Sequence, residues 1–161
     1  LTKLLTIETI QLQEHVATWQ EAITLAAQPL VDNQSIRREY IGAMIASVEE
    51  FGPYIVIAPL VALPHARPEE GALKVGVSLL KLNQSVSFSN DSEHEVNLLI
   101  VLSATDNSSH IGVLTALSEL LGDEEIIQSI IMAESKSEII QIIQSINLTG
   151  VKNKKNISGL R

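Results

Sequence analysis

The chain has 161 residues and a formal net charge of −8, which suits one domain with a buried core and makes nucleic acid, a polyanion, a poor partner. It contains no cysteine, which excludes disulfides, thiolate nucleophiles and cysteine-based metal sites and fits a reducing compartment. No segment is apolar over the roughly 20 residues that a membrane span needs, and the N-terminus lacks the pattern of a signal peptide.

The N-terminal part predicts one helix with a disturbed end. Residues 1–13 show no clear pattern. Thr18 and Glu21 have the spacing of a capping box, in which a hydroxyl and a carboxylate accept hydrogen bonds from free amides of a first turn. Because Pro29 lacks an N–H and clashes with the preceding turn, we expect the helix to be disturbed near Gln28.

A second helix is predicted over residues 36–50. Apolar side chains recur there at helical spacing and form one stripe along the helix. Gly52 and Pro53 should end the helix. The stripe consists of Tyr40, Ile41, Met44, Ile45 and Val48.

The middle of the chain predicts strands. Residues 54–63 are rich in Ile and Val but contain Pro59, which indicates two short strands or a bulged edge strand. Residues 73–82 alternate between apolar and polar side chains and predict a further strand, followed by a polar turn over 83–90. The apolar run 96–102 is typical of a central strand that is covered on both faces.

The last third returns to helices. Residues 106–109 offer several caps for a helix that Gly122 ends. Residues 123–133 and 137–146 predict two more helices, and the lysine-rich residues 151–161 predict a disordered tail. Helices, strands and helices in this order predict an α/β fold, a three-layer α/β/α sandwich with a mixed central sheet, formed by a single domain over residues 1–150.

The best candidate for chemistry is a histidine between two prolines. The chain has four histidines, no glycine-rich phosphate loop, and no histidine pair at the spacing of a helical zinc site. His65 follows an apolar strand and lies between Pro64 and Pro68, which stiffen the backbone and present the imidazole at a strand end. A hydrogen-bonded structural histidine in a proline-rich turn is the alternative. His15 and His94 receive no role.

Residues 58–66 read Ala-Pro-Leu-Val-Ala-Leu-Pro-His-Ala. This segment resembles the active-site signature of IIA (EIIA) domains of the mannitol/fructose superfamily in the bacterial sugar phosphotransferase system (PTS). The resemblance extends over about residues 18–146, and residues 107–110 look like the loop that carries the second histidine of the family. Residues 64–69, with 54–59 before them, are most similar to the ascorbate-specific branch.

The resemblance implies a cytoplasmic phosphotransferase. His65 would take a phosphoryl group from phospho-HPr at Nε2, with Nδ1–H held by an acceptor, and pass it to a IIB component that serves a membrane IIC transporter for ascorbate or a related sugar. His110 would support the phosphoryl group, and Ala66 and Arg67 would bind it. The resemblance implies neither a cofactor nor a metal. The isoleucine-rich helices are compatible with a homodimer.

The chain departs from the family pattern at three places. Leu60 stands where the ascorbate-type pattern has glycine, Pro29 interrupts a usually continuous helix, and residues 46–49 lack the active-site arginine of the mannitol branch. The same histidine chemistry could serve a phosphorylation-sensitive regulatory module without a transport role. The chain could also be an interaction domain without activity, or bind a metal ion through its histidines.

Overall fold

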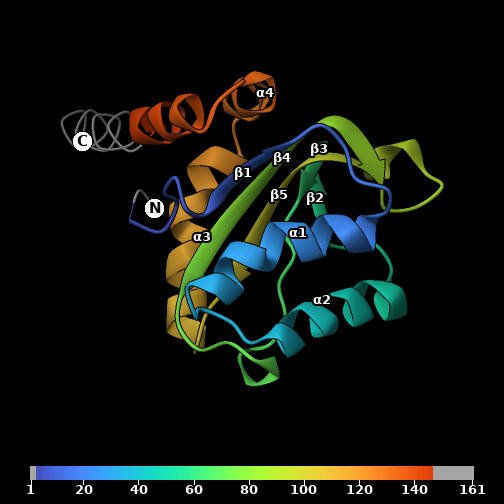
Figure 1. Ribbon diagram of the computed structural model, residues 1–161, viewed down its shortest axis with the longest axis vertical. Coiled ribbons are helices and arrows are strands. Elements are labelled where there is room, and N and C mark those ends of the chain that lie inside the picture. Colours follow the sequence, from blue (N-terminus) through green and yellow to red (C-terminus); the bar gives the residue numbers. More distant parts are fainter. Residues whose placement is uncertain (1–2, 147–161) are drawn as a thin grey trace, which may run out of the picture.

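A mixed five-stranded sheet forms the middle layer of the computed structural model, which describes residues 3–146 (Figure 1). The strands, in sheet order, are β1 (Ile10–Gln13), β4 (Gly76–Ser87), β5 (Glu95–Ser103), β3 (Leu60–Ala62) and β2 (Val56–Ala58). The main helices are α1 (Trp19–Asp32), α2 (Arg38–Phe51), α3 (Asn107–Leu121) and α4 (Glu124–Met132), joined by a helix over residues 136–146. Two short 3-10 helices, η1 (Pro68–Glu70) and η2 (Ser92–His94), lie in loops.

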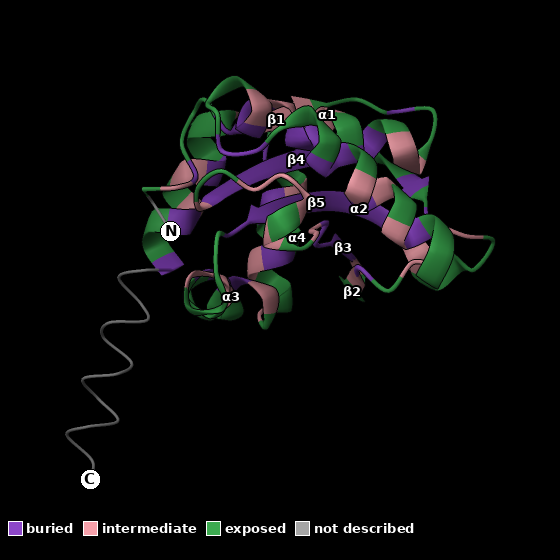
Figure 2. Cartoon of the chain, turned by 90° about the horizontal axis from the view of Figure 1, so that it is seen from below, coloured by how far each residue is buried: buried purple, intermediate pink, exposed green. Residues whose placement is uncertain are grey.

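The helices cover both faces of the sheet. One buried apolar cluster joins α1 and α2 to one face, and a second joins α3, α4 and the last helix to the other (Figure 2). β5 contributes to both, because Leu99 packs toward α1 and α2 while Leu98 and Ile100 pack toward α3. The predicted α/β/α sandwich is therefore confirmed, and so is the mixed sheet, since β1–β4 and β3–β5 are parallel while β4–β5 and β2–β3 are antiparallel.

Two predictions about the strands need correction. Residues 83–87 are not a turn, because β4 continues to Ser87. Past a bulge the strand pairs with β5 again, and the hydroxyls of Ser85 and Ser87 donate to Glu95 across the strands. β1 carried no sequence signal, since four residues are too few for a period and the strand is defined by its parallel pairing with β4. The predicted tail and the boundary at residue 150 lie outside the described residues.

Within residues 3–146, no helix is long and apolar enough to cross a membrane.

The expected disturbance at Pro29 does not occur, because α1 runs through this residue to Asp32. In a regular helix the Leu25 carbonyl would accept the N–H of residue 29, which proline lacks. The side chain of Gln11, next to α1 on β1, donates to that carbonyl instead, at 2.7 Å between Nε2 and O. The cap predicted at the start of α1 is confirmed, since the Thr18 hydroxyl accepts the Glu21 N–H at 3.1 Å. The reciprocal half of the capping box is not formed, because the Glu21 carboxylate accepts the N–H of Ala17 instead of that of Thr18.

Replacing Gln11 should therefore destabilise the protein in a way that depends on Pro29. In Gln11→Ala the Leu25 carbonyl loses its donor, and we expect a loss of about 1 kcal/mol in the free energy of unfolding. In a Pro29→Ala background residue 29 regains its N–H, so the same replacement should cost much less. Urea unfolding of the four proteins measures this coupling, and equal losses in both backgrounds would contradict it.

Leu60 is the residue at which the chain departs from the glycine of the family pattern. Its φ is +70°, in the left-handed region where glycine is favoured. The strain lies in the tight β2–β3 hairpin, where only Pro59 separates the two strands. This hairpin leads directly into the segment that carries His65, so the chain tolerates backbone strain next to its candidate site.

At position 60, glycine should stabilise the folded protein more than alanine does. We expect Leu60→Gly to be about 1 kcal/mol more stable than Leu60→Ala, because glycine adopts a positive φ without a clash of Cβ. The matched control is the exposed Ile57 on β2, where the backbone is extended and the order should reverse. Thermal or urea unfolding of the four variants measures both differences. The same order at both positions would contradict the strain at Leu60.

Candidate active site

His65 and His110 meet because two neighbouring strands end at the same edge of the sheet. β3 and β5 are parallel, so their carboxyl ends lie together. His65 follows β3 after Leu63 and Pro64, and His110 lies in the first turn of α3, which follows β5. The two imidazole rings are 6.0 Å apart between centroids and tilted by 54°. The tertiary structure thus brings together the two histidines that the sequence analysis selected.

The ring of His65 is held in one tautomer. Its Nδ1 lies 2.7 Å from the carbonyl oxygen of Leu63, which can only accept a hydrogen bond, so Nδ1 carries the proton. In the neutral ring, the lone pair that can act as a nucleophile then lies on the other nitrogen, Nε2. The rings of Tyr54 and His65 form a T-shaped pair, with centroids 6.2 Å apart and an interplanar angle of 85°.

The main chain around His65 is tied down on both sides. The Leu102 N–H at the end of β5 donates to the carbonyl of Pro64 at 3.1 Å. The N–H of Ala66 donates to the hydroxyl of Tyr40 at 3.0 Å. The N–H of Leu63 donates to the Ile55 carbonyl at 2.8 Å. A rigid frame therefore presents the imidazole.

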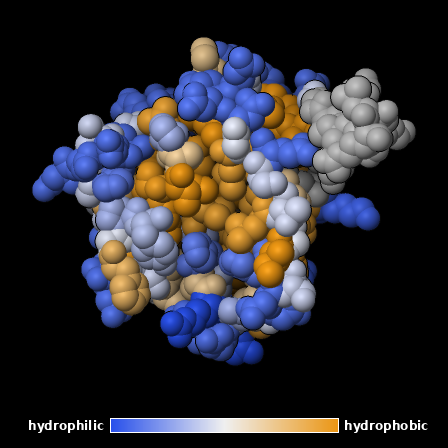
Figure 3. Space-filling view, turned by 180° about the vertical axis from the view of Figure 1, so that it is seen from behind, coloured by the Kyte–Doolittle hydropathy of each residue, from blue (hydrophilic) through white to orange (hydrophobic). Residues whose placement is uncertain are grey.

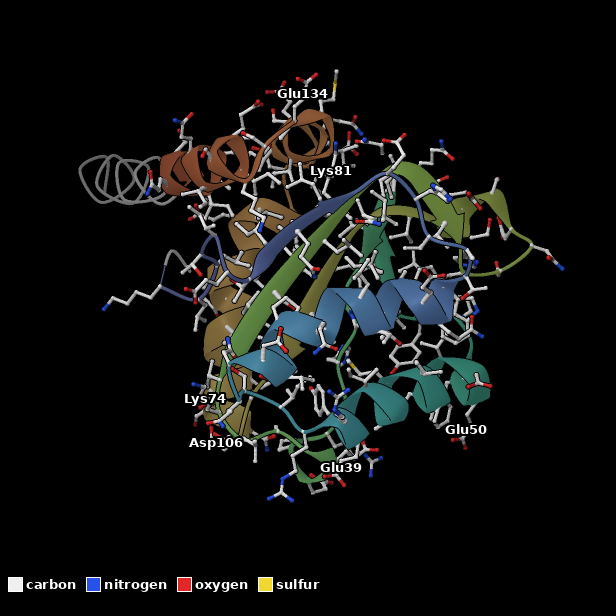
Figure 4. The ribbon with its side chains drawn as sticks, viewed as in Figure 1. Glu39, Glu50, Lys74, Lys81, Asp106 and Glu134 are labelled. Atoms are coloured by element: carbon white, nitrogen blue, oxygen red, sulfur yellow. The ribbon has the colours of Figure 1, made fainter. Side chains whose placement is uncertain are left out.

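His65 opens into a pocket of about 800 Å³ between α2, η1 and the start of α3. Its charged residues are mostly acidic, since Glu50, Glu69 and Glu70 face a single cation, Arg67. Figure 4 shows Glu50 on α2 and Asp106 before α3. The full lining is Ser47, Glu50, Phe51, Tyr54, His65, Ala66, Arg67, Pro68, Glu69, Glu70, Asn107 and His110.

Ala66 and Arg67, the predicted phosphate-binding residues, both line this pocket. Their amides are engaged, however: the Ala66 N–H donates to Tyr40, and the Arg67 N–H donates to the Glu70 carboxylate at 3.1 Å. The side chain of Arg67 is exposed. What Arg67 offers an anion is therefore its guanidinium.

A carboxylate of the protein itself, that of Asp106, already lies at the start of α3. The carboxylate of Asp106 accepts the Ser109 N–H at 2.7 Å, and hydrogen bonds from the amide and hydroxyl of Ser109 keep the Asp106 pKa below its usual value. The Ser109 amide is thus occupied by this carboxylate. The ring of His110 and the side chain of Asn107 remain as donors from α3 toward the pocket.

The sequence analysis did not identify Ser47, Asn107 and Tyr54 as parts of the site. Ser47 lies in the part of α2 that lacks the family arginine, so this wall of the pocket carries a hydroxyl instead of a cation. The sequence did contain a signal for Ser47, because at the spacing i, i+3 and i+4 it shares one helix face with Glu50 and Phe51. Tyr54 lies in the turn before β2, and Asn107 is the first residue of α3 after its cap, so spacing carries no such signal at either position.

The other two histidines lie outside this pocket. His15 is exposed. His94 is half-buried, and its Nδ1 lies 2.6 Å from the Ser89 hydroxyl. Among the residues that the structure describes, no three His, Asp or Glu side chains are grouped as metal ligands.

Two curated relatives cover most of the chain. The mannitol-specific cryptic phosphotransferase enzyme IIA component of Escherichia coli K12 is 49% identical over 125 residues, which cover 78% of this chain and 84% of that protein. The ascorbate-specific PTS system EIIA component of the same strain is 36% identical over 142 residues, covering 87% and 92%. Identity is thus higher with the mannitol-type relative, although the residues around His65 resemble the ascorbate branch.

Solved structures agree with this relationship. The solution structure of the mannitol-specific cryptic IIA enzyme from Escherichia coli superposes with a TM-score of 0.83 at 43% identity, over 88% of this chain and 96% of that one. A complex of mannitol enzyme IIA with phosphorylated enzyme IIB, also from Escherichia coli, matches with a TM-score of 0.76 at 27% identity, over 88% and 99%.

The family model for the phosphoenolpyruvate-dependent sugar phosphotransferase system, EIIA 2, matches residues 3–146, which include both strand ends and both histidines of the pocket. The chain therefore belongs to the EIIA 2 family of this phosphotransferase system.

Proposed function

We propose that this protein is a phosphocarrier that accepts a phosphoryl group on Nε2 of His65 from phospho-HPr and passes it to a IIB component. The observation that carries the proposal is the hydrogen bond between His65 Nδ1 and the Leu63 carbonyl, 2.7 Å long, which leaves Nε2 as the free base beside His110. A neutral ring nitrogen held in this way is the nucleophile that phosphoryl transfer requires.

The transfer balances without a further reagent. The lone pair on Nε2 forms a bond to phosphorus while the P–N bond to the donor imidazole breaks and its electron pair returns to that nitrogen. The positive charge that develops on the His65 ring is shared with Nδ1–H and stabilised by the carbonyl of Leu63. Transfer to IIB reverses these steps at Nε2.

Side chains from three segments would support the phosphoryl oxygens. Ser47 comes from α2, Asn107 and His110 come from the start of α3, and Arg67 comes from the loop before η1. Each offers a hydrogen-bond donor, and Arg67 adds a charge. Ala66 would contribute as a wall of the pocket, since its amide is held by Tyr40.

The surroundings of the pocket suit a protein partner. Phe51, Tyr54 and Ile111 lie at or next to the pocket and are 69%, 47% and 63% exposed. Figure 3 shows a broad apolar area on the side of the molecule away from α1 and α2. An apolar rim around an acidic pocket favours docking of a partner with an apolar and basic face.

The proposal also names the partners of the protein and the compartment in which it works. HPr would be the donor and IIB the acceptor, with a membrane IIC component as the indirect partner of IIB. The relatives suggest a mannitol-type or ascorbate-type sugar, and membership of the family supports a carrier that works in the cytoplasm. A homodimer is compatible with this role.

Intact mass spectrometry tests the proposal directly. Incubation with phosphoenolpyruvate, enzyme I and HPr should add one acid-labile phosphoryl group to the wild type and none to His65→Ala. His94→Ala is the matched control, because His94 lies outside the pocket, and should be labelled like the wild type. An unlabelled wild type, beside a IIA protein that is labelled in parallel, would overturn the proposal; a labelled His65→Ala variant would mean that another residue accepts the phosphoryl group.

Loss of the one cation in the pocket should slow the transfer. For Arg67→Ala we expect the phosphorylation rate to fall about threefold, since an exposed charge pair contributes about 0.5 to 1 kcal/mol. Arg38→Ala is the control, because this arginine is also exposed but does not line the pocket. Rapid-quench measurement at limiting HPr compares the two rates, and equal effects would show that only the net charge matters.

A further inference from the structure

A buried tyrosine connects the loop of His65 to the central sheet. Tyr40 lies in the first turn of α2 and is 1% exposed. Its hydroxyl donates to the carbonyl of Leu102 at 2.7 Å and accepts the N–H of Ala66 at 3.0 Å. Leu102 also donates its own N–H to the carbonyl of Pro64. One residue at the end of β5 therefore holds the main chain before His65 directly and the main chain after it through Tyr40.

We infer that the Tyr40 hydroxyl is a positioning group for His65: it fixes the peptide unit that follows the histidine and ties it to Leu102, which holds the preceding one, so that Nδ1 remains on the Leu63 carbonyl and Nε2 faces the pocket. Tyr40 does not line the pocket and acts through Ala66. The inference rests on the proposed function for its effect on transfer, but its effect on the histidine ring does not depend on that function.

The hydroxyl keeps its proton under physiological conditions. Burial raises the pKa of Tyr40 to about 12, although the hydrogen bond from Ala66 opposes this shift. The O–H therefore remains a donor to Leu102 at every pH at which the protein would operate. Because the Tyr40 hydroxyl does not ionise in this range, its hydrogen bond to Leu102 holds the loop at every such pH.

The inference also assigns the amide of Ala66 a role. In the sequence analysis Ala66 was a phosphate-binding residue, and a free backbone N–H would have been its contribution. That N–H is donated to a buried hydroxyl instead, and it orients the peptide that follows His65. Removal of the hydroxyl would free this N–H and the Leu102 carbonyl at once and release the segment after His65 from α2, while the Leu102 N–H would still hold the Pro64 carbonyl.

Tyr40→Phe is the variant that tests the inference, because it keeps the buried ring and removes only the hydroxyl. The matched control is Ser78→Ala: Ser78 is fully buried, and its hydroxyl donates to the Ala26 carbonyl at 2.6 Å, away from the pocket. Urea unfolding shows whether both variants fold and lose similar stability. Two readouts then separate positioning from stability.

The first readout is the ring of His65 in the unphosphorylated protein, observed by ¹⁵N NMR, which distinguishes the two neutral tautomers. We expect Tyr40→Phe to lower the population with a proton on Nδ1, and Ser78→Ala to leave it at the wild-type value. The second is the single-turnover rate of transfer from phospho-HPr, which should fall at least about tenfold in Tyr40→Phe and remain unchanged in Ser78→Ala.

The outcomes separate the two proposals. A wild-type ring spectrum and rate in Tyr40→Phe would overturn the positioning role, and so would equal losses in both variants, because these would indicate general destabilisation. If the wild type accepts no phosphoryl group, the proposed function fails, and the NMR comparison alone decides the role of Tyr40.

Discussion

The parallel pairing of β3 with β5 is the constraint on which the site depends. Because the two strands point the same way, the segment after β3 and the segment after β5 emerge at one edge of the sheet, 45 residues apart in sequence between His65 and His110. β3 has only three residues, so it could not hold this position through its own ladder alone. The hydrogen bonds of Leu102 with Pro64, and with Tyr40, continue the link between the strands beyond the end of β3.

Strand β5 contributes both to the stability of the core and to the geometry of the site. This strand is buried on both faces, with Leu99 and Val101 in one apolar cluster and Leu98 and Ile100 in the other. A strand clamped between two cores moves little, because close-packed side chains tolerate few rearrangements. The groups that hold the histidine loop are therefore attached to a strand that is buried on both faces, whereas the strained backbone of Leu60 lies in the hairpin at the edge.

The features that could be predicted from the sequence are those whose cause is local. The apolar run of β5, the stripe of α2 and the cap at Thr18 each carry their signal within a few residues, and the structure agrees with these three. The proline-flanked His65 also carries a local signal, and it lines a pocket. The features that were missed depend on distant partners. Pro29 remains in a helix because Gln11 replaces its hydrogen bond, and residues 83–87 remain in a strand because Glu95 lies opposite. In the sequence Tyr40 is one more residue of an apolar stripe, and only the structure shows that its hydroxyl donates to Leu102.

The weak charge of the pocket agrees with a carrier better than with a phosphate-binding protein. A fixed cation on α2 would hold a phosphoryl group tightly, but Ser47 occupies that wall and the one arginine of the pocket is exposed to water. An exposed charge contributes little, because water screens it. Three carboxylates around the site oppose accumulation of a dianion further. Under the proposed function, the energy of a phosphohistidine in such a pocket would be set mainly by the P–N bond and by the orientation of the imidazole, so a precise and rigid placement of His65 would matter more than strong binding of phosphate.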